Sequence, residues 1–282
     1  MGIRTDMAVE AHELSRGDAK EIEGVKLTST EHGSIKRTIV DVLNDNGAKT
    51  LNKMIGRYIT IDAPDIKNSI DDFESVSKML ANDLRELCGT SRKTLVVGLG
   101  NRAITPDALG GEVVDKLLVT SHMKRYMPDV LDDSYGNVSA ISPGVMGTTG
   151  METVDIIKGI TDADKPDIII AIDSLAGADI NRVTTSIQIA DTGIAPGSGV
   201  GNHRNGLNED TLGIKVIAIG VPTVIAAELL GGEELEEEYR SLMVTTNDID
   251  AVIKRMSRTL ANGINLALHK GITLRDIEEL VG

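Results

Sequence analysis

Two aspartates of this 282-residue chain occupy positions where a carboxylate could do chemistry. Asp107 lies in the segment TPDALG, which follows an apolar run and a glycine-containing turn. Asp173 closes the apolar run DIIIAID, where a buried charge is costly unless something compensates it. If the two runs are neighbouring strands, both carboxylates face one crevice and share a proton. One carboxylate would then act on water as a base and the other as an acid, as in aspartic peptidases.

Other interpretations of these acids remain open. Asp107 could be an ordinary acid in the first turn of a helix, where the helix dipole favours it, and Asp173 could cap a turn. Asp191 begins an Asp-Thr-Gly tripeptide like that of pepsin-like proteases. Those proteases are β folds that need two such loops, so a structural turn is expected here and Asp191 is a reserve candidate for a third acid. Glycine-rich loops at 144–150 and 191–206 could offer N–H groups to an oxyanion, and Gly147 and Asn101 are candidate supporting residues.

A nucleotide site is the main competing hypothesis for the glycine turn. Gly98-x-Gly100-x-x-Ala103 follows a predicted strand and loosely matches the dinucleotide fingerprint. In that fingerprint the helix starts inside the glycine turn and its N–H groups meet the pyrophosphate. Pro106 instead favours a helix that begins at 105–107, so the loop is too long. No GxxxxGK[ST] motif is present.

A metal site is a further alternative. The five histidines form no HxH or HxxxH pair, although Asp107 and Asp173 could assemble with His122 or His203 in space. The single cysteine, Cys88, excludes a disulfide and a multi-cysteine site. The GxSxG motif of serine hydrolases is also missing, because Gly197-Ser198-Gly199 lacks the required strand and helix. We therefore expect no metal and no cofactor.

The chain from residue 94 onward alternates strand patterns with helix patterns. Its apolar runs are continuous, as strands covered on both faces require. We therefore expect an α/β fold, a three-layer sandwich with a twisted, mostly parallel central sheet. Ligands collect beyond the carboxyl ends of the strands in such sheets. The expected strands are 94–99, 137–142, 167–173, 184–191 and 214–220, and the expected helices are 107–122, 150–160 and 222–230.

Residues 1–65 are polar with short β-like runs, which predict a smaller N-terminal β-containing region. Apolar residues recur at intervals of three and four from 69 to 88 and predict a helix, with Ser69 at its N-terminus. A second long amphipathic helix is predicted over 247–269, for core packing or for a subunit contact.

The net charge of -14 and the pI near 4.8 argue against a protein that coats nucleic acid. No apolar run approaches the length of a membrane span. The first residues, MGIRTDMAVEAHE, lack the apolar core of a signal peptide. These features predict a cytoplasmic protein without direct contact to nucleic acid or membrane.

Five ordered segments together closely resemble the spore germination protease family. They are VVGLGN with TPDALG, ISPGVMGTTGMET, IIIAIDSLA, IQIADTGIAPGSGVGN and TLGIKVIAIGVPT. Members of that family are endopeptidases that degrade small acid-soluble spore proteins during germination. The resemblance implies a fold similar to the hydrogenase-maturation peptidases and an aspartic mechanism without an obligatory metal. It places the catalytic aspartates at Asp107 and Asp173, and implies a homotetramer made as a zymogen in the developing spore core.

The N-terminus supports the zymogen hypothesis. Cleavage sites in the family's substrates resemble Thr-Glu-(Phe/Ile)-Ala-Ser-Glu, cut after the first Glu, and residues 5–10 read TDMAVE. We therefore predict self-cleavage between Asp6 and Met7. The expected organisation is a propeptide at 1–6, an N-terminal region at 7–90 and an α/β catalytic region at 91–282, the last two forming one continuous domain.

Overall fold

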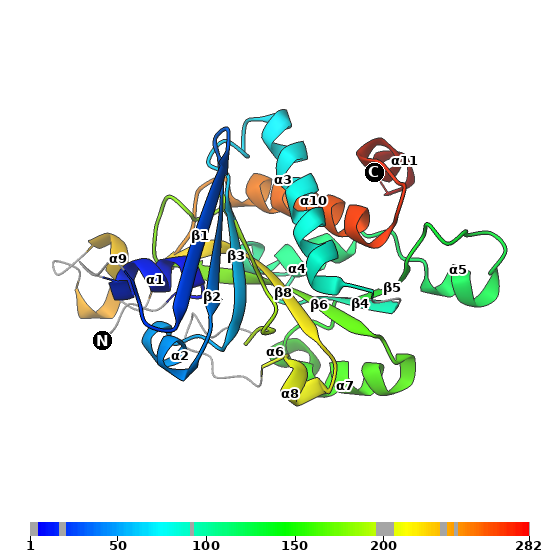
Figure 1. The fold of residues 1–282 in the computed structure, drawn as a ribbon, viewed down its shortest axis with the longest axis horizontal. Helices are drawn as coiled ribbons and strands as arrows, with labels where there is room; N and C mark the ends of the chain where they lie inside the picture. The colour runs from blue at the N-terminus through cyan, green and yellow to red at the C-terminus, as the bar shows by residue number, and fades with distance from the viewer. Residues whose placement is uncertain are drawn as a thin grey trace.

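The computed structural model describes residues 5–16, 21–90, 93–195, 206–231, 236–239 and 242–281. Strands within these ranges form one nine-stranded sheet in the order β1-β2-β3-β7-β8-β6-β4-β5, with β9 paired to β8 (Figure 1). The strands are β1 Val25–His32, β2 Ile35–Val42, β3 Gly56–Asp62, β4 Lys93–Gly98, β5 Asn137–Ile141, β6 Ile168–Gly177, β7 Ser186–Ala190, β8 Val216–Ala226 and β9 Met243–Val244.

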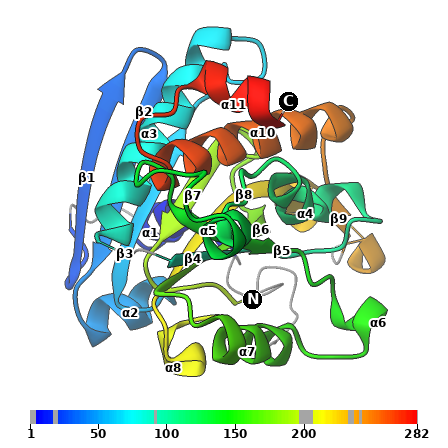
Figure 2. The same ribbon diagram turned by 90° about the vertical axis from the view of Figure 1, so that its right-hand side faces the viewer.

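Helices cover both faces of this sheet. The α-helices are α1 Ala8–Arg16, α2 Asp45–Leu51, α3 Ile70–Cys88, α4 Leu109–Val114, α5 Ser121–Tyr126, α6 Met146–Thr149, α7 Thr153–Asp164, α8 Glu209–Leu212, α9 Glu228–Gly231, α10 Ile249–Leu268 and α11 Leu274–Val281, and the 3-10 helices are η1 Thr105–Asp107 and η4 Glu237–Tyr239. In Figure 2, α3, α4 and α10 lie on one side of the sheet, and α7 and α8 lie on the other. Within the described ranges, no helix is long and apolar enough to cross a membrane.

The central strand β6 shows why its apolar run is continuous. Ile168, Ile170 and Ile172 pack into the cluster formed with α3, α4 and α10, whereas Ile169 and Ala171 pack into the cluster formed with α7 and α8. Successive side chains of a strand point to opposite faces, so both faces of β6 are buried. The three-layer α/β architecture predicted from the sequence is therefore confirmed.

The sheet has a parallel half and an antiparallel half. Strands β5, β4, β6 and β8 pair in parallel. Strands β7, β3, β2 and β1 continue the sheet in antiparallel pairing. The N-terminal β-like runs thus join the sheet through the pairing of β3 with β7. This pairing brings the N-terminal quarter of the chain beside the strands that follow Asp173.

Two predicted helices are shorter than expected. The helix expected over 107–122 is replaced by η1, α4 and α5, because Asn265 of α10 binds the chain between α4 and α5. Its side chain accepts the N–H of Leu118 and donates to the carbonyl of Lys116. The helix expected from 222 begins only at Glu228, since the β-branched residues Thr223 to Ile225 extend β8.

The predicted helices over 69–88 and 247–269 are confirmed as α3 and α10. The Ser69 side chain accepts the N–H of Asp72 and caps α3, as its position in the sequence predicted. The two helices pack on each other, and Leu80 of α3 lies where a side chain at Gly263 of α10 would be. Core packing therefore accounts for the apolar face of α10.

Candidate active site

Asp107 is held by the turn that follows β4. The turn leads into η1, which starts at Thr105 as Pro106 predicted. The backbone N–H of Asn101 donates to Oδ2 of Asp107 over 2.8 Å. Gly100 has a φ of +98°, and a Cβ there would lie 2.0 Å from the carbonyl oxygen of Asp107 and 2.9 Å from its Oδ1. The glycine is therefore needed because Asp107 fills the inner side of the turn, where a nucleotide phosphate would have to bind.

The sequence predicts that Asp173 ends its strand, but in the structure Asp173 lies inside β6. The strand continues to Gly177 because β8 continues alongside it. On its other side β4 stops at Gly98, which pairs with Ile172. Asp173 is thus the first residue of β6 beyond the end of β4. Its side chain is 5% exposed, and its Oδ1 accepts the N–H of Ser174 over 2.9 Å.

The structure brings both aspartates to one cavity of about 420 Å³. Asp107 reaches it from η1 and Asp173 from β6. Gly144 and Val145, from the glycine-rich loop before α6, line the same cavity. Asp6, predicted only as a cleavage position, lines it as well. Two acids and the predicted cleavage position therefore share one space.

The chain around Asp6 runs along β6. The N–H of Asp6 donates to the carbonyl of Ala176 over 3.0 Å, and the N–H of Ala176 donates to Oδ2 of Asp6 over 2.9 Å. The next residues, Met7 and Ala8, are fully buried. Asp6 and Met7 are thus held against the sheet, and the chain enters helix α1 at Ala8.

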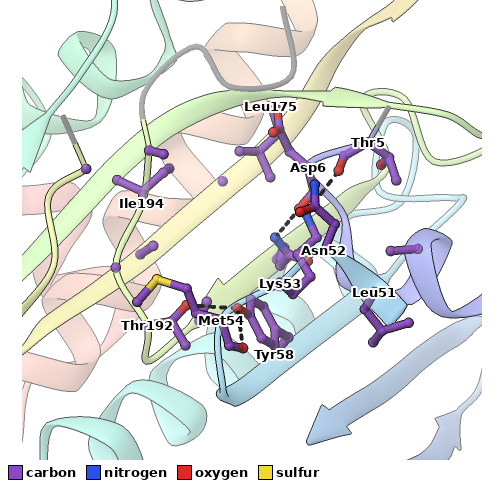
Figure 3. A pocket seen from close by; sticks show the side chains of 18 of the residues that line it. Thr5, Asp6, Leu51, Asn52, Lys53, Met54, Tyr58, Leu175, Thr192 and Ile194 are labelled. Atoms are coloured by element: carbon purple, nitrogen blue, oxygen red, sulfur yellow. Dashed lines mark hydrogen bonds between the residues drawn. The ribbon is translucent and has the colours of Figure 1, made fainter. Parts of the chain in front are cut away.

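Two side chains bind the carbonyl oxygen of Asp6. Lys53 Nζ donates to it over 2.9 Å (Figure 3). Gln188 Nε2 donates to the same oxygen over 3.0 Å. Both donors line a second cavity of about 780 Å³, which Asp6 and Asp173 also line. Neither residue was predicted from the sequence. The sequence does place Gln188, a polar amide, in the middle of the apolar run SIQIA, and a buried amide needs hydrogen-bond partners. In the structure Gln188 is only 8% exposed.

Glu10 anchors the other end of the same segment. Its side chain is 2% exposed and accepts the N–H groups of Ala178 over 2.7 Å and Asp179 over 3.1 Å. The hydroxyl of Thr5 also donates to it. Burial raises the pKa of Glu10, and these hydrogen bonds oppose that shift. An acidic residue four positions after the predicted cut is therefore bound by backbone N–H groups.

The structure does not bring the other candidate supporting residues to the two cavities. Asp191 Oδ1 accepts the N–H of Arg57 over 2.7 Å, so it fixes the start of β3. Gly147 is exposed in α6, although Gly144 of the same loop lines the smaller cavity. Asn101 contributes through its backbone, by the hydrogen bond to Asp107. Gly197-Ser198-Gly199 and most of the predicted loop at 191–206 lie outside the described residues.

The histidines offer little to these cavities. His203 lies outside the described residues, and neither His122 nor His269 lines either cavity. His269 accepts the N–H of Gly136 at Nδ1, and burial lowers its pKa to about 4. Among the described residues, no group of three or more His, Cys, Asp or Glu side chains could hold a metal ion. Burial raises the pKa of Cys88 to about 11, so its thiol is not a nucleophile at neutral pH.

The chain is similar to known proteases over nearly its whole length. The model of the germination protease family matches residues 3–236. A germination protease of Clostridium tetani (strain Massachusetts / E88) is 43% identical over 98% of both chains. That of Clostridium perfringens (strain SM101 / Type A) is 42% identical over 99% of both. That of Bacillus subtilis (strain 168) is 38% identical, over 96% of this chain and 94% of the relative.

Among solved structures, a NiFe hydrogenase maturation protease HycI from Thermococcus kodakarensis KOD1 matches 64% of this chain and 98% of its own, at 17% identity and a TM-score of 0.36. The family match and the full-length relatives agree with each other and with the segments quoted from the sequence. This chain therefore belongs to the germination protease family and is a peptidase.

Proposed function

We propose that this peptidase is an aspartic-type endopeptidase in which Asp107 and Asp173 share a proton and activate water. The observation that carries the proposal is the cavity that both residues line together with Asp6, the residue before the predicted cut. Two carboxylates around one space cannot both ionise cheaply, so one holds a proton at working pH. Such a pair supplies a base and an acid at the same point.

The proposed reaction uses only these two groups and water. The ionised carboxylate takes a proton from water while the water oxygen bonds to the carbonyl carbon, and the carbonyl electron pair moves to oxygen. The tetrahedral intermediate then collapses and the C–N bond breaks. The protonated carboxyl gives its proton to the leaving nitrogen, and the pair has exchanged roles. No metal is required at any step.

The substrates that we propose are small acid-soluble spore proteins, cut during germination in the spore core. The relatives' name, germination protease, and the family's cleavage pattern support this substrate class. Residues 5–10 of this chain match that pattern and are held in the site, which supports a zymogen that cuts itself between Asp6 and Met7. A homotetramer, which the family resemblance implies, is testable by light scattering of the purified chain.

Asp107→Asn and Asp173→Asn test the proposed mechanism. Each variant should cut a peptide containing Thr-Glu-Phe-Ala-Ser-Glu at least about a thousandfold more slowly than wild type, because the amide cannot hold or transfer the proton. Asp191→Asn is the matched control, since Asp191 lies outside both cavities and its amide oxygen can still accept from Arg57. It should retain near-normal activity.

The assay measures initial cleavage rates by chromatography, with circular dichroism to verify folding. Near-normal cleavage by either dyad variant would refute the aspartic mechanism. Activity lost on treatment with a strong chelator and restored by a divalent cation would favour the metal-dependent alternative.

A further inference from the structure

Three strands place an acid and an amide in one row across the sheet. Asp173 of β6 is in register with Gly220 of β8, and Gly220 is in register with Gln188 of β7. Residues in register point to the same face of a sheet, and neighbouring strands lie about 4.8 Å apart. Asp173 and Gln188 are therefore about 10 Å apart at their Cα atoms, on the same face. Met7 and Ala8 pack on this same face, in one cluster with Leu175 of β6.

Gly220, in the middle of this row, leaves room for the side chain of Leu175, which lies on the same face as Asp173. Gly220 has no side chain, and a Cβ there would lie 2.5 Å from the Leu175 side chain. The larger cavity is lined by Gly220 together with Asp173, Gln188 and Asp6. The predicted cut therefore lies at a cavity that both the acid and the amide line.

Two hydrogen-bond donors that line this cavity bind the same atom. Gln188 Nε2 and Lys53 Nζ both donate to the carbonyl oxygen of Asp6, over 3.0 and 2.9 Å. The orientation of the Gln188 amide is fixed, because its Oε1 accepts the N–H of Ala8 over 2.6 Å. Lys53 also donates to the carbonyl of Thr5 over 3.0 Å. Burial lowers the pKa of Lys53, whereas the carboxylates of Asp6 and Glu10 oppose that shift.

When water attacks a peptide carbonyl, the oxygen gains negative charge, and donors already placed at that oxygen stabilise the transition state. We propose that Lys53 and Gln188 are the oxyanion-binding pair of this peptidase. They polarise the carbonyl of the residue before the cut, first Asp6 of the chain itself and then the equivalent acidic residue of a substrate. This inference rests on the proposed cleavage between Asp6 and Met7.

Two substitutions separate this role from simple anchoring of the N-terminus. Gln188→Glu keeps the oxygen that accepts from Ala8 but replaces the donor to the Asp6 carbonyl, and Lys53→Met removes the cation at similar length. Each should slow self-cleavage of the full chain about 10²–10³-fold, as loss of one oxyanion donor does elsewhere. Lys53→Arg should restore most of the rate. Lys49→Met, on the exposed side of α2, is the matched control and should cleave normally.

Two readouts are taken on each variant. Intact mass follows the rate of cleavage, and hydrogen exchange of residues 7–12 reports whether the segment is still bound. The proposal predicts slow cleavage with wild-type protection of the segment, and a lower kcat with little change in KM on a peptide substrate. Wild-type cleavage rates, or slow cleavage only in proportion to lost protection, would overturn it. Asp107→Asn and Asp173→Asn are run in parallel: if they cleave normally, the proposed function fails, whereas if they alone are slow, only the oxyanion assignment fails.

Discussion

At the scale of single residues, the sequence was enough to single out the two aspartates that line the smaller cavity, but it gave no indication of Lys53. A carboxylate that closes a run such as DIIIAID is a strong signal, because a buried charge needs a compensating interaction. Asp107 was marked by its glycine turn, and the structure explains that turn by the fit of Gly100 around Asp107. Lys53 has no such signal, since its role depends on a contact with Asp6 that only the folded chain makes.

Gly100→Ala tests whether the turn exists to hold Asp107. The added Cβ would collide with the carbonyl oxygen of Asp107, and alanine would be strained at the positive φ of this position. The variant should therefore lose about 1–3 kcal/mol of stability. Its peptidase activity should fall strongly even where the variant is fully folded, because Asp107 is displaced. Urea unfolding and peptide cleavage at a temperature where the variant is folded measure the two effects.

Gly147→Ala is the control for that experiment. Nothing lies within 4 Å of a Cβ at this helical position, so alanine should change stability by less than about 1 kcal/mol, in the stabilising direction, and leave activity unchanged. Wild-type activity in Gly100→Ala would contradict the assigned role of the turn.

At the scale of helices and strands, the spacing of apolar residues correctly predicted the elements that bury one apolar face. It did not predict the places where residues distant in the sequence bind and interrupt an element. Helices α3 and α10 were predicted because each has one long apolar face. The helix after Asp107 breaks because Asn265, far along the chain, binds the backbone at Lys116 and Leu118. The antiparallel pairing of β3 with β7 also joins distant segments, and no local pattern indicates it.

Helix α1 carries a pH-dependent contact at Glu10. Because burial raises the pKa of this carboxyl, the folded state favours its protonated form. Protonated Glu10 therefore contributes its full share to the free energy of unfolding below its ordinary pKa of 4.5. That contribution is lost as the pH rises through the raised pKa of the folded state. Acid should therefore hold residues 5–10 more firmly in the site. We also expect acid to promote self-cleavage, because the proposed pair of carboxylates needs one proton bound and one released.

Glu10→Gln mimics the protonated side chain and tests this contact. The variant should show a flatter dependence of unfolding free energy on pH from 4.5 upward than wild type, measured by urea titration across that range. The matched control is Glu13→Gln, on the exposed side of α1. Its unfolding free energy should depend on pH above 4.5 more steeply than that of Glu10→Gln. Identical pH profiles for wild type and Glu10→Gln would contradict the role given to burial.

At the scale of the whole molecule, the proposed site is assembled from both halves of the sheet. Asp107 and Asp173 come from the parallel half, whereas Gln188 comes from the antiparallel half and Lys53 from the loop that leads into it. The N-terminal segment bridges the two halves, because Asp6 hydrogen bonds to Ala176 of β6 and to Gln188 of β7. In the proposed mechanism, the single sheet therefore fixes the position of the two aspartates relative to Lys53 and Gln188.

The most direct test is the mass of the purified full chain during mild acidification, for wild type and for the two dyad variants. Wild type should lose residues 1–6, giving a new N-terminus at Met7, in a reaction whose rate does not depend on protein concentration if the cut is intramolecular. Asp107→Asn and Asp173→Asn should keep Met1 under the same conditions. A wild-type chain that stays intact, or a dyad variant that is cut at the same bond and rate, would contradict the account.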